Sequence, residues 1–331
     1  MTDSSILELA KVAQSGRRAL LATVIRASGP SYRKPGASAV VAEDGEIIGA
    51  ISGGCLEADL LVAAEEILRG APPRVLEYDT SSEEDLIWGT SSGCGGRVQI
   101  LLAPVPAELV SAAQAELRAG RAVVLHTCIA PGPDLGRRTL GGATARTEPY
   151  WYSDGETICH QLLAPPVTML LCGAGNDAQP VAKLAAAATF RVAVVDHRAS
   201  WATAERFPDA QAVIVCQPEE LDAHLPIPAG SYAVLMTHHY HKDLAYLKML
   251  LEQPVAYVGL LGARERSRAL VRQLLRERPD LGEAARTRLR APVGLEIGAD
   301  GPFEIALSIV AELVAERAGM QKQAGGKSLA Q

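Results

Sequence analysis

The sequence predicts an α/β protein of two domains, with a Rossmann-like parallel sheet in the C-terminal half and a mixed α/β domain before it. The first observation is the stretch Met169–Arg198, which reads as strand, glycine turn, helix and strand. The second is the alternation of apolar runs and helical segments after it, which is typical of parallel strands joined by helices. The third is Ala164–Pro166, which has the composition of a linker. We therefore expect domains at residues 1–164 and 165–318, and a small, polar, disordered tail at 319–331.

The glycine turn of the C-terminal half carries the G-x-G-x-x-A pattern of dinucleotide-binding folds. Gly173 would permit the tight turn, and Gly175 would let a pyrophosphate approach the backbone at the helix N-terminus, where free N–H groups favour anions. Asn176 lies in the same turn, and Ala178 takes the third, helix-packing position. Asp196 follows about 20 positions on, where it would bond a ribose hydroxyl. The pattern indicates a nucleotide-like ligand, and a glycine-rich turn without a ligand is the alternative.

The composition argues against several classes of function. The 331 residues include 32 basic and 38 acidic side chains, a net charge of −6, and no basic stripe that would favour nucleic acid. No apolar run is as long as a membrane span, and Met1–Gly16 lacks the charged and apolar regions of a signal peptide. We therefore expect a soluble, cytoplasmic protein with no nucleic-acid or membrane partner. The six cysteines include no C-x-x-C pair, so a disulfide framework is not expected.

The N-terminal half predicts strands and helices in mixed order. Gly45 marks the turn of a hairpin, and Gly120, directly after an amphipathic segment, is typical of a helix C-terminus. Pro131–Gly142 bears glycines and reads as a loop. The expected helices are Ile6–Ala13, Leu56–Leu68 and Ala107–Ala119, and the expected strands are Ala19–Ile25, Ala37–Ala42, Glu46–Ile51, Arg74–Tyr78, Val98–Leu102, Ala122–Cys128, Tyr150–Tyr152 and Glu156–Leu163.

Two cysteines lie in glycine-rich turns, which sets them apart from the others. Cys55 follows Gly53 and Gly54, and we expect it in the first turn of a helix, where free N–H groups and the helix dipole would favour its thiolate. A small residue at a strand–helix junction is the ordinary alternative. Cys94, before Gly95, lies in a second such turn, whose backbone could form an anion nest. The remaining cysteines lie in apolar runs, the usual place for a buried thiol, namely Cys128, Cys159, Cys172 and Cys216.

The C-terminal half continues with strands and helices in alternation. The expected strands are Met169–Cys172, Arg191–Val195, Ala212–Cys216, Tyr232–Met236 and Val255–Leu260. Helices are expected up to Ala188, at Leu244–Leu251 and at Arg264–Leu275. A last helix carries apolar residues at i, i+3, i+4, i+7 and i+8, which predicts a core-facing stripe of Ala306, Ile309, Val310, Leu313 and Val314.

Two further loops follow strands of the expected sheet and would face its ligand crevice. His238, His239 and His241 follow the fourth strand, and imidazole suits a metal site. Histidines that bond backbone at the start of a helix are the better alternative. Gly262 and Arg264 follow the fifth strand, where Arg264 could hold a phosphate through two bonds. Surface pairing with Glu265 or another neighbour is the alternative for Arg264.

These stretches together resemble one family, the xanthine dehydrogenase accessory proteins XdhC and CoxI. The resemblance runs in order from about Leu20 to Glu312 and covers both halves of the chain. It is more specific than the dinucleotide pattern alone, because several separate motifs carry it. The motifs are Gly29–Gly36, Ile51–Glu57, Asp85–Gly89, Gly93–Gly96, Cys172–Ala178, Thr237–His239, Gly259–Gly262 and Ala291–Ala299.

The resemblance implies an N-terminal XdhC-type domain, a C-terminal Rossmann domain and a role in the maturation of molybdenum hydroxylases. Such a protein would bind the molybdenum cofactor, as molybdopterin or its dinucleotide form. It would support sulfuration of this cofactor by a cysteine desulfurase and deliver it to the large subunit of the apo-enzyme. It would act as a chaperone, and as a homodimer, rather than as an enzyme with turnover of its own.

The resemblance also suggests roles for the candidate residues. The turn Gly173–Ala178 would take the phosphate end of the cofactor, with Asp196 on a ribose if a dinucleotide is bound. Cys55, together with Cys94, would hold molybdenum as a soft ligand until transfer. The competing class is an NAD(P)-dependent oxidoreductase, which the same fingerprint supports. Beyond the three histidines, no clear group of residues for substrate chemistry supports that class.

Overall fold

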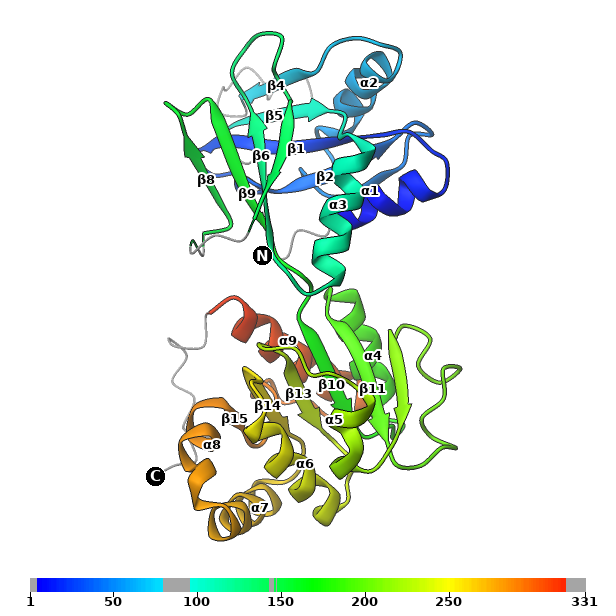
Figure 1. Cartoon of the computed structure of the whole chain (residues 1–331), viewed down its shortest axis with the longest axis vertical. Helices are drawn as coiled ribbons and strands as arrows, with labels where there is room; N and C mark the ends of the chain where they lie inside the picture. The colour runs from blue at the N-terminus through cyan, green and yellow to red at the C-terminus, as the bar shows by residue number, and fades with distance from the viewer. Residues whose placement is uncertain (1–4, 80–95, 143–145, 147, 320–331) are drawn as a thin grey trace. The chain divides into compact units, whose positions relative to one another are not determined.

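A computed structural model describes residues 5–79, 96–142, 146 and 148–319 of the chain. The chain divides into two compact units, Met1–Pro165 and Pro166–Gln331, each with its own sheet structure and core (Figure 1). Cys94 and Gly95, and residues 320–331 of the tail predicted at 319–331, lie outside the described residues. In the part of the chain that is described, no helix is both long enough and apolar enough to span a membrane.

The N-terminal unit contains a five-stranded antiparallel sheet in the order β3-β2-β1-β5-β4. Gly45, with φ of +86°, forms the turn of the predicted hairpin between β2 and β3. β1 carries a bulge. Val24 pairs with Ile100, and Arg26 pairs with Gln99, which directly precedes Ile100, so β1 has one residue more than β5 at this point. The strands are β1 Ala19–Ser28, β2 Ser38–Ala42, β3 Ile47–Gly49, β4 Arg74–Asp79 and β5 Arg97–Ala103.

A second sheet of the N-terminal unit has four antiparallel strands in the order β7-β6-β9-β8. β7 lies inside Pro131–Gly142, so the prediction of a loop throughout that segment was wrong. The strand forms because its residues pair with β6, from Thr127 opposite Arg138 to Val124 opposite Gly141. The strands are β6 Val123–Cys128, β7 Arg138–Gly141, β8 Tyr150–Ser153 and β9 Ile158–Leu163.

Three helices of the N-terminal unit cover the two faces of the larger sheet. Alternate residues of β1 point to opposite faces, as the pleat of a strand requires. Leu20, Ala22 and Val24 pack against helix α2, whereas Leu21 packs in a cluster with helices α1 and α3. The helices are α1 Ser5–Gln14, α2 Glu57–Leu68 and α3 Ala107–Arg118, and Gly120, with φ of +77°, follows α3 as predicted.

The C-terminal unit is built on a six-stranded parallel sheet in the order β12-β11-β10-β13-β14-β15. This order confirms the predicted Rossmann-like fold, because the chain winds outwards in both directions from β10 and β13. The carboxyl ends of these two strands mark the topological switch point, where folds of this class have their ligand crevice. The strands are β10 Thr168–Cys172, β11 Arg191–Asp196, β12 Ala212–Val215, β13 Tyr232–Leu235, β14 Tyr257–Leu260 and β15 Leu289–Arg290.

Helices lie on both faces of the parallel sheet (Figure 1). Helices α4 and α9 pack on one face, and α6, α7 and α8 on the other. The predicted apolar stripe of α9 is confirmed except at Val314, which is 37% exposed because it lies at the edge of the buried face. The α-helices are α4 Ala178–Ala187, α5 Leu221–His224, α6 Tyr240–Glu252, α7 Arg264–Glu277, α8 Gly282–Arg288 and α9 Pro302–Arg317, with 3-10 turns η2 Pro218–Glu220 and η3 Pro279–Leu281.

Candidate functional site

The switch-point crevice is lined by two loops, one after β10 and one after β13. Gly173 ends the first strand with φ of +119°. A Cβ atom on Gly173 would lie 2.5 Å from the carbonyl oxygen of Met236 and 2.8 Å from the amide nitrogen of Thr237. Only glycine fits so close to backbone in this conformation. The first glycine of the fingerprint therefore brings the two loops of the crevice together.

The second glycine of the fingerprint lies under an acidic side chain. Asp177 is the N-cap residue of α4, and its Oδ1 atom lies 2.5 Å from the position that a Cβ atom on Gly175 would take. Its Oδ2 atom lies 2.6 Å from Nε2 of His238, in the loop after β13. Ala178 is fully buried, in keeping with a helix-packing position. The space beside Gly175 thus holds a carboxylate of the protein itself.

His238 is held in an unusual conformation beside this carboxylate. Its φ is +58°, in the left-handed region that few residues other than glycine adopt. The hydrogen bond to Asp177 raises the pKa of His238, and burial opposes this rise. The imidazole is therefore more readily protonated than a free histidine, and as a cation it pairs with Asp177 across the switch point.

The other two histidines do not join His238 in a metal site. His239 is the N-cap residue of α6 and His241 lies in its first turn, so the helix begins at Tyr240 and not at the predicted Leu244. Across the described residues, no group of three or more His, Cys, Asp or Glu side chains is arranged to hold a metal ion. Asp243 is fully buried and accepts hydrogen bonds at 2.6 Å from Oγ1 of Thr237 and from Arg266.

Asp196 ends β11 as predicted, but protein groups surround its carboxylate. It is 1% exposed, and each oxygen accepts two hydrogen bonds. Arg198 donates from Nε, Nη2 and its backbone N–H, and Ala174 donates its N–H over 2.7 Å. Burial alone would raise the pKa of Asp196, but these hydrogen bonds outweigh it and lower the pKa. A ribose hydroxyl would have to replace one of these donors.

Two arginines stack on one tryptophan beside Asp196. Arg198 and Arg206 place their guanidinium carbons 4.7 and 4.5 Å from the ring centre of Trp201. Arg206 also donates a hydrogen bond of 3.0 Å to the side-chain oxygen of Asn176 and one of 3.2 Å to the carbonyl of Ala174. In this structure Asn176 thus bonds the protein, and its loop is tied to the segment after β11.

The loop after β14 contains Gly262 and Arg264. Gly262 has φ of +144°, and Arg264 is the first residue of α7. The exposed guanidinium of Arg264 forms an ion pair with the exposed Glu296. This pairing is the alternative that the sequence left open, although the partner is Glu296 and not a residue next in sequence.

The turn before α2 carries Cys55 and is organised by two side chains. Oγ of Ser52 accepts hydrogen bonds from the N–H groups of Gly54 and Leu56 and donates one of 2.5 Å to the carboxylate of Glu57. That carboxylate also accepts from the N–H of Leu56. Leu56 is the N-cap and α2 begins at Glu57, so the prediction that Cys55 lies in the first helical turn was wrong. Cys55 is an exposed free thiol just outside the helix.

Aromatic residues lie around this turn. The ring of Tyr32, which is 58% exposed, comes 3.8 Å from the Cβ position of Gly53. The hydroxyl of Tyr78 is buried and has no hydrogen-bond partner among the described residues. Burial, and then the charges of Asp59 and Cys55, raises the pKa of Tyr78 to about 12. The ring of Tyr32 therefore lies beside Gly53 of this turn, and the buried phenol of Tyr78 lies within electrostatic reach of Cys55.

The remaining described cysteines are free thiols away from this turn. Cys159, Cys172 and Cys216 are buried as predicted, and burial raises the pKa of each thiol. Cys128 is only half-buried, so the prediction of a buried thiol there was wrong. It lies at the end of β6, where the strand leaves the sheet core.

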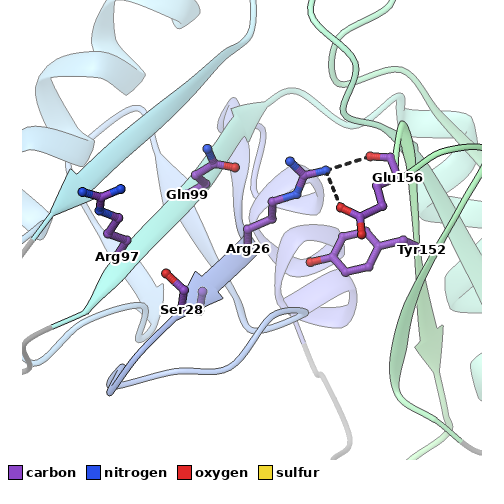
Figure 2. Close-up of a pocket in the computed structure, with 7 residues that line it drawn as sticks. Arg26, Ser28, Arg97, Gln99, Tyr152 and Glu156 are labelled. Atoms are coloured by element: carbon purple, nitrogen blue, oxygen red, sulfur yellow. Dashed lines mark hydrogen bonds and ion pairs between the residues drawn. The ribbon is translucent and has the colours of Figure 1, made fainter.

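The sequence did not point to a polar pocket that lies at one end of the larger N-terminal sheet (Figure 2). Its side chains come from the last residues of β1, the first residues of β5 and the β8–β9 hairpin. Polar residues at alternate positions, as in Arg26 and Ser28 or in Arg97 and Gln99, are the signal that could have indicated it.

Comparisons with known proteins agree with this architecture. The model of the XdhC Rossmann domain matches residues 169–313, and that of the XdhC and CoxI family matches residues 12–79. A crystal structure of a xanthine dehydrogenase from Bacillus halodurans superposes with a TM-score of 0.81 at 32% identity, over 99% of this chain and 98% of that chain.

Two curated relatives extend over most of the chain. A protein of Bacillus subtilis described as a probable xanthine dehydrogenase subunit is 31% identical over 316 residues, which is 90% of this chain and 93% of the relative. The molybdenum cofactor insertion chaperone PaoD of Escherichia coli is 27% identical over 305 residues, 92% of this chain and 85% of PaoD. With both family models in chain order and relatives of nearly equal length, the chain belongs to the XdhC and CoxI family.

Proposed function

We propose that this protein binds the molybdenum cofactor as cargo and delivers it to the apo-form of a molybdenum hydroxylase of the xanthine dehydrogenase or CO dehydrogenase type. The observation that carries the proposal is the exposed thiol of Cys55 in a glycine turn ordered by Ser52 and Glu57. A relative named a molybdenum cofactor insertion chaperone covers nearly the whole chain and supports the same role.

The geometry of the turn suits a temporary hold on molybdenum. A thiolate is a soft ligand that binds a metal centre and can later release it to another site. Gly53 and Gly54 place no side chains of their own next to Cys55, while Ser52 and Glu57 fix the backbone around it. Cys94, in the second glycine turn, would be a further thiol ligand. An exposed thiol would also leave the cofactor open to sulfuration by a cysteine desulfurase before delivery.

The Rossmann crevice would take the nucleotide end of a dinucleotide cofactor, or a separate nucleotide such as NAD(P). Gly173, Gly175, Asn176 and Ala178 form the turn for a pyrophosphate, with Asp196 near the ribose. Because Asp177 lies over Gly175, a phosphate would have to replace its carboxylate beside His238. Gly262 and Arg264 would bound the same crevice, where the phosphate would compete with Glu296 for Arg264.

Cofactor content of the purified protein tests this proposal. We would express the wild type, Cys55→Ala and Cys128→Ala with the cofactor pathway active, and measure molybdenum and pterin per chain. Cys55→Ala should lose most of the bound molybdenum, whereas Cys128→Ala, which removes a half-buried thiol of the same unit, should retain it. Equal retention in all three proteins would remove Cys55 from the role.

Transfer and turnover distinguish the two classes of function. Loaded wild-type protein should activate an apo molybdenum hydroxylase in vitro, and Cys55→Ala should not. An NAD(P)-dependent oxidoreductase would instead consume NAD(P)H with a small substrate in the absence of any client enzyme. That result would favour the competing class.

A further inference from the structure

The polar pocket of the N-terminal unit has a volume of about 350 Å³. Figure 2 shows its two walls: Arg26, Ser28, Arg97 and Gln99 rise from two neighbouring strands, and Tyr152 and Glu156 face them from the β8–β9 hairpin. Ala27 completes the lining. The strand side of the pocket is therefore lined by polar side chains, and the hairpin side adds an aromatic ring and a carboxylate.

The register of β1 and β5 explains why Arg26 and Arg97 both line the strand side of the pocket. Ser28 lies directly opposite Arg97, and Arg26 lies opposite Gln99. Arg26 and Arg97 are thus diagonal neighbours on one face of an antiparallel pair, a spacing of about 7–8 Å that long side chains can bridge. Figure 2 shows the two side chains extending in opposite directions, Arg26 towards Glu156 and Arg97 away from it, so both guanidinium groups would turn inwards to bind one ligand group placed between them.

The guanidinium of Arg26 is only partly satisfied by the protein. Its Nη2 atom bonds the carbonyl oxygen of Glu156 at 3.0 Å and the carboxylate of the same residue at 3.2 Å. Its Nε atom is buried and has no hydrogen-bond partner among the described residues. The guanidinium also lies 5.8 Å from the ring centre of Tyr152. A buried donor without a partner is costly, so an acceptor in this pocket would be favoured.

The guanidinium of Arg97 is likewise bonded by described residues of the protein at only one of its nitrogens. Its Nε atom donates to Asp79 over 2.6 Å, and its terminal nitrogens make no hydrogen bond to a described residue. Gln99 is held in place by Glu77 at 2.7 Å, and no described residue bonds the hydroxyl of Ser28. Glu156 lines the pocket, whereas Asp79 and Glu77 belong to the neighbouring strand β4. The ion pairs of Arg26 with Glu156 and of Arg97 with Asp79 are exposed, and exposed ion pairs are weak.

We propose that this pocket is an oxyanion site that takes the phosphate group of a small phosphorylated molecule. Arg26 and Arg97 bind the phosphate oxygens from two sides, as guanidinium groups do well, and Ser28 donates its hydroxyl between them. The volume exceeds that of a phosphate ion, so the remainder of the ligand lies toward Tyr152. The site is independent of the role of Cys55 in the proposed function.

The pocket also lies at the base of two of the family motifs. Ser28 is followed at once by the Gly29–Gly36 segment, and Gly96 directly precedes Arg97. A Cβ atom on Gly96 would lie 2.6 Å from the carbonyl oxygen of Ser28. Ser28 and Gly96, which adjoin the pocket in sequence, therefore pack closely against each other.

Calorimetric titration of the full-length protein, purified without molybdenum cofactor, tests the site. The probes are inorganic phosphate and adenosine 5′-monophosphate. Arg97→Gln should weaken binding of both about 10- to 100-fold, because it removes a charged hydrogen-bond donor. Arg121→Gln is the matched control, since Arg121 is an exposed arginine of the same unit that pairs with Glu116 away from the pocket. It should bind like the wild type.

A second variant should change the affinity for phosphate in the opposite direction. Glu156→Gln removes a carboxylate that competes for Arg26, so phosphate should bind about two- to fivefold more tightly. Tighter binding of the monophosphate than of inorganic phosphate, lost in Arg97→Gln, would identify a phosphate ester as the ligand of this pocket, and equal binding would identify free phosphate. Monophosphate binding that Arg97→Gln leaves unchanged would place that ligand elsewhere, in the Rossmann crevice of the proposed function. Unchanged affinity in Arg97→Gln, or weaker binding in Glu156→Gln, would overturn the proposal. Because the protein carries no molybdenum, neither result depends on the role of Cys55.

Discussion

The two regions that carry the family motifs differ in how their polar groups are satisfied. In the C-terminal crevice the charged groups pair within the protein: Asp196 with Arg198, Asp177 with His238, and Asp243 with Arg266. In the N-terminal unit Cys55 is exposed, and Tyr78 and Arg26 have buried donors without a described partner. Three acids of the crevice thus pair with cations of the protein, and Nε of Arg206 is a buried donor there without a described partner. In the N-terminal unit, the exposed thiol and the two donors without a described partner are available to a ligand.

Two ion pairs on α7 give the largest expected effect. Arg266→Met leaves the buried Asp243 without its cation and should lower the free energy of unfolding by about 3–5 kcal/mol. Arg264→Met breaks the exposed pair with Glu296 and should cost less than about 1 kcal/mol. Urea unfolding of both variants measures the difference. Equal losses would show that the crevice is not held by the buried pair.

Two glycines of the same unit give an intermediate effect. Gly173→Ala forces a Cβ atom against the backbone of Met236 and should lower the free energy of unfolding by about 2–4 kcal/mol. Gly230→Ala, with φ of +79° but nothing within 4 Å of the new atom, should cost only about 1–2 kcal/mol. Thermal and urea unfolding compare the two. A similar loss for both would mean that the contact between the crevice loops adds nothing.

The pair of His238 and Asp177 gives the smallest effect, and it depends on pH. The pKa of His238 is raised in the folded protein, so its stabilising contribution is complete below the unfolded pKa and is lost as pH rises through the folded pKa. The wild type should therefore exceed His238→Asn in stability by less than about 1 kcal/mol at about pH 5.5, and lose this advantage at about pH 8.5. Asparagine suits the left-handed backbone at this position.

An NMR titration of the His238 ring gives an independent check on this pair. Asp177→Asn removes the carboxylate and should lower the pKa of His238 towards its ordinary value. A stability advantage that persists at high pH, or an unchanged titration in Asp177→Asn, would contradict the pairing.

Most of the fold could be predicted because local patterns determine it. The run from β10 through Gly173 and α4 to Asp196 has apolar strands, a glycine turn and a helix in register, and each of these signals lies within a few residues. β7 was missed because glycines flank it and made the whole segment read as a loop, although its partner strand β6 directly precedes it in the chain. The start of α2 was misplaced because Ser52 and Glu57 bond each other and delay the first helical residue past Cys55.

The site was less predictable than the fold. The fingerprint correctly indicated that Asp196 lies at the end of its strand. It does not specify that Arg198, two residues later, forms hydrogen bonds with the carboxylate of Asp196. The pocket at Arg26 and Arg97 depends on the pairing of β1 with β5 and on the position of the hairpin that bears Glu156. Such pairings are set by the whole core and not by neighbouring residues.

The bulge in β1 shifts by one residue the alternation of side chains between the two faces of the sheet. Before it, even-numbered residues such as Val24 point towards α2; after it, Ala27 packs on that side and Arg26 turns away. The extra residue, Ile25, lets one strand supply core in its first part and ligand-binding side chains in its last. Counting from Leu20 in steps of two would place Arg26 and Ser28 inside the core. The insertion of a single residue is what brings them to the pocket.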